Sequence, residues 1–140
     1  MPDYRVGNYG LAQAYAAAVG VVLIAVGLLG FISNPIVSAA SGALFATNAV
    51  HNIVHVATGA LALYIAFGLG GDARANGVIG FGVLYAIIFA VVWLSPTLFG
   101  LFGSAPANGA DHLLHLALAV VSLAVGFVTR AGAQRTAATS

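Results

Sequence analysis

Four long apolar stretches constrain the fold more than any other feature of this sequence. They span about residues 9–32, 46–69, 77–94 and 111–129, and charged side chains are almost absent from them. About 20 helical residues cross the 30 Å hydrocarbon layer of a bilayer. Only 5 % of the 140 residues are charged, whereas a soluble domain has about 25 %. The sequence therefore predicts an integral membrane protein with four spanning helices and the lipid bilayer as its main partner.

The segments between the apolar stretches predict where the helices end. Asn34-Pro35 and Ser95-Pro96 follow the first and third stretches, and proline disfavours helical geometry in the residue before it. Residues 72–76 are interpreted as a tight polar turn, and residues 130–140 as a frayed, solvated tail. A cleavable signal peptide is the alternative for the first stretch, which is longer than the 7–15 apolar residues of such a peptide. We expect a single domain over residues 1–140.

The arginines predict the orientation of the helices. Arg5 lies in the N-terminal head, Arg74 in the middle turn, and Arg130 and Arg135 in the tail, while the two other loops contain no Lys or Arg. The positive-inside rule then places both termini in the cytoplasm. A formal net charge of +1 argues against nucleic-acid binding, which requires clustered basic residues.

The chain is built as an internal repeat with an offset of sixty residues. Residues 48–55 read NAVHNIVH and residues 108–115 read NGADHLLH, and all four histidines lie in these two segments. Each half has two spans, so both halves keep the same orientation, as in parallel repeats. The fold class is therefore all-α, an integral membrane four-helix bundle built from two tandem helical hairpins. Small residues predicted to permit close helix contact are Ala16, Gly20, Gly27, Gly59, Ala60, Gly77, Gly80 and Gly82.

The two repeated segments contain the candidate site. Residues three or four apart share a helix face, so a pseudo-twofold axis would let the two polar faces meet. Histidine and aspartate are ligands for zinc, iron or manganese. The predicted metal or cofactor ligands are His51, His55, Asp111 and His115. The neighbouring polar side chains predicted to support or replace them are Asn48, Asn52, Asn108 and His112.

Three other interpretations of the histidines remain open at this point. His55 and His115 could be axial ligands of a haem-type macrocycle, with Gly59 and Ala119 leaving room for its ring. Ionisable groups at membrane depth also suit an ion path, although the inner halves of the helices lack residues to continue one. Finally, the cluster could be purely structural, since the two asparagines occupy N-cap positions and polar side chains hold membrane helices together.

The same segments carry a resemblance to a known family. The chain resembles the DUF4383 family of bacterial membrane proteins in three features: residues 28–32 (LLGFI) before a proline turn, the N-x-x-H-N-x-x-H pattern of residues 48–55, and Ala110-Asp111 with Leu114-His115 and a trailing Gly126. The resemblance covers about residues 9–130 and implies a small four-span protein of the bacterial plasma membrane. The family has no assigned activity, and His112 is a position that it does not require. The first loop is shorter than in many relatives.

The function predicted from the sequence is non-enzymatic. We expect a small structural or accessory membrane protein, with other membrane subunits or further copies of itself as partners and no nucleic acid. Short loops leave little room for a substrate site of about 300 Å³ or more. The alternative is a metal- or haem-binding membrane protein, redox-active or not, that uses the histidine cluster.

Overall fold

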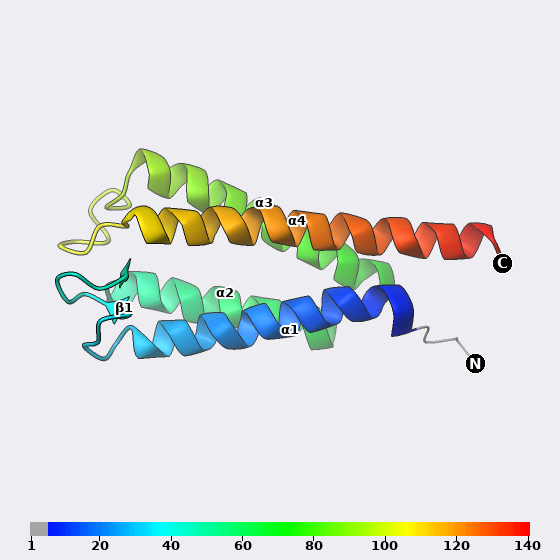
Figure 1. The fold of residues 1–140 in the computed structure, drawn as a ribbon, viewed down its shortest axis with the longest axis horizontal. Helices are drawn as coiled ribbons and strands as arrows, with labels where there is room; N and C mark the ends of the chain where they lie inside the picture. Colours follow the sequence, from blue (N-terminus) through cyan, green and yellow to red (C-terminus); the bar gives the residue numbers. More distant parts are fainter. Residues whose placement is uncertain (1–5) are drawn as a thin grey trace.

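Four helices account for most of the molecule (Figure 1). The computed structural model describes residues 6–140. The helices are α1 (Val6–Leu29), α2 (Ala49–Gly68), α3 (Gly71–Leu94) and α4 (Gly109–Ala138). All four are long and apolar enough to cross a membrane. A short parallel pair of strands, β1 (Val37–Ser38) and β2 (Phe45–Ala46), closes the loop between α1 and α2.

The helices form two hairpins, as the repeat predicts. α1 packs along α2, and α3 packs along α4. The hairpins meet mainly through α1, which contacts both α3 and α4, whereas α2 touches α3 only slightly. The prediction of two tandem hairpins in an all-helical bundle is confirmed. The uneven contact between the hairpins becomes important at the site, because it leaves α2 and α3 apart.

Glycines allow the closest approach within each hairpin. A Cβ atom on Gly20 would lie 2.8 Å from the carbonyl oxygen of Gly59, and one on Gly59 would lie 2.9 Å from that of Gly20. In the second hairpin, a Cβ on Gly82 would lie 2.9 Å from the backbone nitrogen of Leu123. These backbone atoms cannot easily move away, so Gly20, Gly59 and Gly82 are packing residues. Gly80 and Ala60 are exceptions, since nothing lies within 4 Å of an added Cβ on Gly80 and Ala60 is exposed.

Two hydroxyl contacts tie one hairpin to the other. Tyr15 Oη of α1 lies 2.7 Å from Ser122 Oγ of α4. Thr58 Oγ1 of α2 lies 2.8 Å from Tyr85 Oη of α3. Unpaired hydroxyls are costly in an apolar interior, so these pairs favour this arrangement of the hairpins.

Several predicted helix limits differ from the structure; α2, for example, begins at Ala49 and not at residue 46. α1 ends at Leu29 and not at residue 32. α3 begins at Gly71, so residues 72–76 form its first turns and are not a separate turn; Asp72 there suits the positive end of the helix dipole. α4 runs from Gly109 to Ala138, so most of the predicted frayed tail is helical. The tail contains several alanines and no proline, and alanine has the highest helix propensity.

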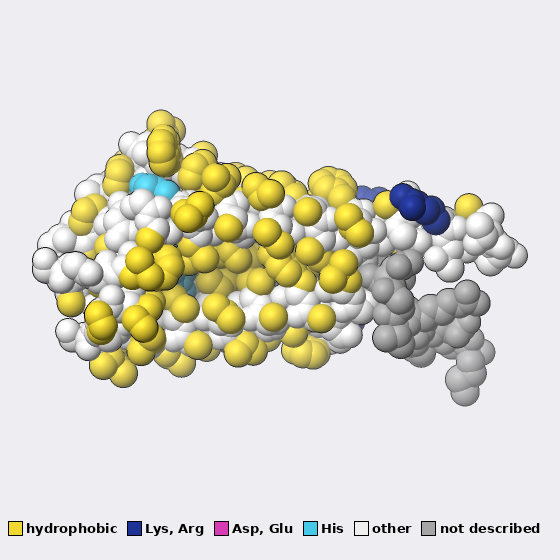
Figure 2. All heavy atoms as spheres, viewed as in Figure 1, with side chains coloured by type: hydrophobic (Ala, Val, Ile, Leu, Met, Phe, Trp, Pro, Cys, Tyr) yellow, Lys and Arg dark blue, Asp and Glu magenta, His cyan; other side chains and the backbone are white. Residues whose placement is uncertain are grey.

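Basic side chains gather at one end of the molecule, opposite the two long loops (Figure 2). Between the ends, the visible surface is largely hydrophobic. Large apolar side chains are exposed there; Phe67, for example, is 69 % exposed. This distribution fits contact with the bilayer. Arg5, which also entered the orientation argument, lies outside the described residues.

Candidate functional site

An asparagine caps each histidine-bearing helix. Asn48 Oδ1 accepts a hydrogen bond of 3.0 Å from the backbone N–H of His51. Asn108 Oδ1 accepts one of 3.1 Å from Asp111 N–H, and Asp111 Oδ2 accepts one of 2.9 Å from Asn108 N–H, which completes a capping box. These bonds satisfy backbone donors that a helix start leaves unpaired. The caps therefore fix the first turns of α2 and α4.

The same residues also fasten each helix start to the loop of the other hairpin. Asn48 Nδ2 donates to the Leu101 carbonyl at 2.9 Å, and Asn108 Nδ2 donates to the Leu44 carbonyl at 3.0 Å. Asp111 Oδ2 additionally accepts from Ala46 N–H at 3.1 Å. The repeat thus produces reciprocal ties, and these hold the starts of α2 and α4 close together.

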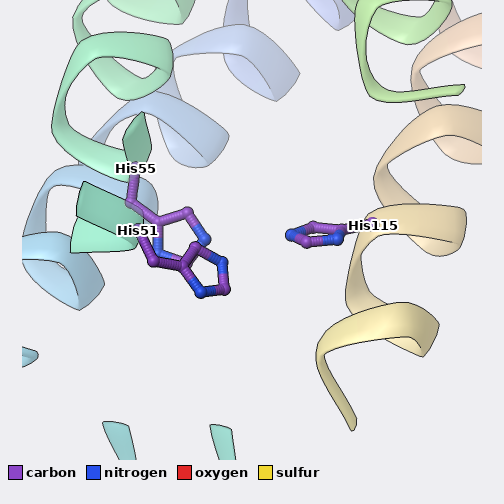
Figure 3. Close-up of side chains that lie close together, drawn as sticks. All are labelled: His51, His55 and His115. Carbon is purple, nitrogen blue, oxygen red and sulfur yellow. The ribbon is translucent and has the colours of Figure 1, made fainter. Parts of the chain in front are cut away.

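Three histidines converge just inside these ties. His51 and His55 of α2 extend toward His115 of α4 (Figure 3). One ring nitrogen from each lies within 4.8 Å of the others. The ring centroids of His51 and His55 are 4.5 Å apart, and that of His115 is 5.7 Å from His51 and 6.3 Å from His55. All three side chains are at most 2 % exposed.

Most ring nitrogens of this cluster lack hydrogen-bond partners. His51 Nδ1 lies 3.2 Å from the Ala46 carbonyl oxygen. Four other nitrogens are buried with no partner among the described residues: His51 Nε2, both nitrogens of His55, and His115 Nδ1. A buried polar group without a partner costs about 1–3 kcal/mol. The cluster therefore has four buried ring nitrogens that are available to a ligand.

A cavity of about 220 Å³ adjoins the three histidines. Apart from them, its walls are almost entirely apolar and come from α2, α3 and the loop before α4. Phe102 of that loop stacks on His51, with centroids 4.6 Å apart and ring planes 8° from parallel. Tyr85 lines the cavity with its ring centroid 6.0 Å from that of His115. The cluster thus has a space beside it into which a bound molecule could extend.

The structure brings together His51, His55 and His115 but not Asp111. The role of Asp111 as a metal ligand stays a prediction from the sequence. Its Oδ2 is held by the N–H groups of Asn108 and Ala46, whereas its Oδ1 is buried and has no partner among the described residues. Asp111 is absent from the group of converging ligand atoms.

The predicted supporting residues have different roles. Asn48 and Asn108 act as caps and ties. Asn52 is buried and packs against Gly30, where an added Cβ would clash with its side-chain amide. His112 lies outside the cluster, and its ring meets Trp93 edge-on at a centroid distance of 5.1 Å.

Sequence reasoning missed three groups at the site. The Ala46 carbonyl carries no side-chain signal. Phe102 lies in a loop that the sequence left without predicted structure. Tyr85 lies within an apolar stretch and belongs to no motif, although a tyrosine hydroxyl buried in a membrane helix needs a partner, and this one has Thr58.

Comparison with known proteins identifies a family and no individual relative. Neither curated proteins nor solved structures contain a significant match. A family model described as a domain of unknown function, DUF4383, matches residues 13–128. That range includes both histidine segments and most of all four helices. The chain therefore belongs to the DUF4383 family.

Proposed function

We propose that this membrane protein binds a transition-metal ion through His51, His55 and His115. The observation that carries the proposal is the set of four buried ring nitrogens without partners. Histidines that served only as struts between helices would be expected to use those nitrogens in hydrogen bonds, because buried polar groups are normally paired. A metal ion would satisfy one nitrogen from each of the three rings at once.

The surroundings of His51 support metal binding. The Ala46 carbonyl can only accept, so His51 Nδ1 must carry the proton in this contact. That tautomer leaves the Nε2 lone pair free. Metal-binding histidines commonly donate their other N–H to a backbone carbonyl or a carboxylate, which orients the ring. In addition, Asp111 anchors Ala46 through its backbone N–H, so the carboxylate supports this ring indirectly.

The spacing of the ligand atoms is compatible with an ion after a small closure. Zinc–nitrogen bonds are about 2.0–2.1 Å, which puts neighbouring ligand atoms of a tetrahedral site about 3.3 Å apart. The histidine nitrogens lie within 4.8 Å of one another, so the rings must approach by at most about 1.5 Å. Rotation of the side chains can supply this movement. An all-imidazole set favours zinc, iron or copper over manganese, which prefers oxygen ligands.

The haem alternative has less support. The cavity of about 220 Å³ is smaller than the roughly 300–1,000 Å³ typical of sites for drug-sized ligands. The ring of His51 lies near both other histidine rings, where it would crowd a macrocycle placed between His55 and His115. The non-enzymatic accessory role and the partner subunits stay predictions from the sequence.

The arginines also give the proposed metal site a location in the membrane. The described arginines gather at the end of the bundle opposite the histidines. With the basic end in the cytoplasm, the metal site lies near the outer face of a bacterial plasma membrane.

The proposal is tested by metal binding to protein purified in mild detergent without a polyhistidine tag. Zinc titration and metal analysis are expected to give about one ion per chain, as a single three-histidine site requires. His55→Ala and His115→Ala should each abolish binding while circular dichroism shows an intact helical fold. His112→Ala is the matched control, because this histidine lies on the same helix outside the cluster, and it should bind normally. Zinc binding that survives both cluster substitutions, or none in the folded wild-type protein, contradicts the proposal.

A further inference from the structure

The cavity beside the histidines is closed toward the loop end of the bundle. Phe102 is buried, stacks on His51 and packs with Val92 and Ala107 in a small apolar cluster. Leu98 lines the cavity from the same loop. The reciprocal asparagine ties hold this loop and the first loop in place. Water and hydrated solutes therefore meet a packed apolar cover at this end.

On its side, the cavity reaches the surface that faces lipid. α2 and α3 make few contacts with each other, and both contribute to the cavity wall. Val54 of α2 and Val91 of α3 are partly exposed, and Ile87 is 56 % exposed. These side chains stand along the two spanning helices, at the level of the bilayer. An opening between them would admit molecules dissolved in lipid.

The walls indicate what kind of molecule fits. Almost all of the lining surface is apolar, and its polar exception is the histidine cluster. A dry apolar cavity of about 150 Å³ in another protein holds benzene, so 220 Å³ suits one substituted ring or a short chain. Three histidines leave a fourth position open in a four-coordinate zinc site.

We propose that a small uncharged lipophilic molecule enters between α2 and α3 and binds the metal through a single nitrogen or oxygen donor. This inference rests on the proposed metal site and adds the class of its ligand. The molecule places its donor at the open metal position and its apolar part against Ile88, Val91 and Phe102. The binding step is ligand addition to the metal, with displacement of any water already bound there.

The test uses full-length protein loaded with Co²⁺, whose visible absorption changes with its ligand set. The probe is 1-butylimidazole, an imidazole donor with an apolar tail. The matched probe, 1-(3-aminopropyl)imidazole, has the same donor and a tail of equal length that ends in an ammonium group. Burial of a charged group is strongly disfavoured, so half-saturation should require at least about tenfold more of the charged probe.

Substitutions separate the cavity from simple partition into detergent. Val91→Trp fills the cavity away from the metal ligands, and it should retain Co²⁺ and lose the response to 1-butylimidazole. Val83→Trp is the matched control, since Val83 lies on α3, is 47 % exposed and does not line the cavity; it should respond like wild type. Ile88→Trp is the second cavity-filling variant in case Val91→Trp does not fold.

The outcomes distinguish this inference from the proposed function. If Co²⁺ and zinc both fail to bind the folded protein, the metal site and its ligand are overturned together. If Co²⁺ binds but the two probes act equally, or the cavity-filling variants still respond to 1-butylimidazole, only the lipid-side ligand is overturned. Metal retention with loss of the response in the filled variants, against a normal Val83→Trp control, is the expected result.

Discussion

Asp111 offers a test of which side chains bind the proposed metal ion and which only hold the ligands in position. Its Oδ2 accepts hydrogen bonds from Asn108 N–H and Ala46 N–H. Asp111→Ala leaves both amides without their acceptor, at about 1–3 kcal/mol each when buried. Because both bonds are only partly buried, we expect a loss of about 2–4 kcal/mol in the free energy of unfolding.

Asp111→Asn should behave differently. Its amide oxygen can replace Oδ2 as the acceptor for both N–H groups, so the variant loses the charge assistance of these bonds and not the bonds themselves. A loss of about 1 kcal/mol is expected. Zinc binding should persist, because the carboxylate is not among the converging ligand atoms.

Both variants are compared with wild type by reversible unfolding in detergent, followed by circular dichroism, and by zinc titration of the folded state. The expected order of stability is wild type, then Asp111→Asn, then Asp111→Ala. Equal destabilisation of the two variants would refute the account of the capping bonds. A folded Asp111→Asn protein that has lost zinc would show instead that zinc binding requires the carboxylate itself.

Three further predictions concern packing, protons and orientation. Gly59→Ala should lower the free energy of unfolding by about 1–3 kcal/mol, because the new Cβ lies 2.9 Å from the Gly20 carbonyl oxygen. Gly80→Ala, whose Cβ meets nothing within 4 Å, should stabilise the protein slightly through helix propensity. Thermal unfolding that ranks the two variants the other way would contradict the packing argument. Zinc affinity should fall as pH is lowered, since protons compete with the metal for the ring nitrogens. Because burial disfavours the charged imidazolium, the fall is expected only in strongly acidic solution, and a calorimetric affinity unchanged down to the pH at which the helical fold is lost would speak against histidine ligation. The chain has no cysteine, so a single introduced cysteine can be labelled specifically. With both termini in the cytoplasm, a membrane-impermeant maleimide applied to intact cells should label Ser41→Cys in the first loop and not Ser140→Cys. The opposite labelling pattern would reverse this orientation.

Much of the fold follows from features that the sequence displays directly. Apolar length predicts the four helices, and the sixty-residue repeat predicts the two hairpins. The four-residue spacing of His51 and His55 places both on one face of α2, and the repeat brings His115 to the equivalent position on α4. These are local or periodic properties, so no knowledge of the loops is needed to infer them.

Two features were ambiguous in the sequence, because one residue type can fill either of two roles. Asp111 is three residues after Asn108, a spacing that suits a capping box. It is also four residues before His115, a spacing that places both side chains on one helix face as possible ligands. The nearby Ala46 N–H, which donates to Asp111 Oδ2, favours the capping role. The polar residues 72–76 suit either a turn or a helix start, and the Gly70–Gly71 pair already provides the turn.

The cavity depends on long-range packing that periodicity does not encode. Its cover requires a loop in which Leu98 and Phe99 adopt positive φ angles of 47° and 54°, a conformation uncommon for such residues. Its side opening requires α1 to mediate most contacts between the hairpins. Neither feature has a sequence motif, so the position of Phe102 over His51 emerges only from the structure.

X-ray absorption at the zinc edge of the loaded protein tests the central claim most directly, because it reports the ligand atoms around the ion. In the wild-type protein, three imidazole nitrogens are expected at about 2.0–2.1 Å from the zinc ion. Any zinc retained by His55→Ala should have one imidazole fewer, and the ligand shell of His112→Ala should be unchanged. A shell with fewer than three imidazoles in the wild-type protein, or one that contains a carboxylate lost in Asp111→Asn, would contradict the claim.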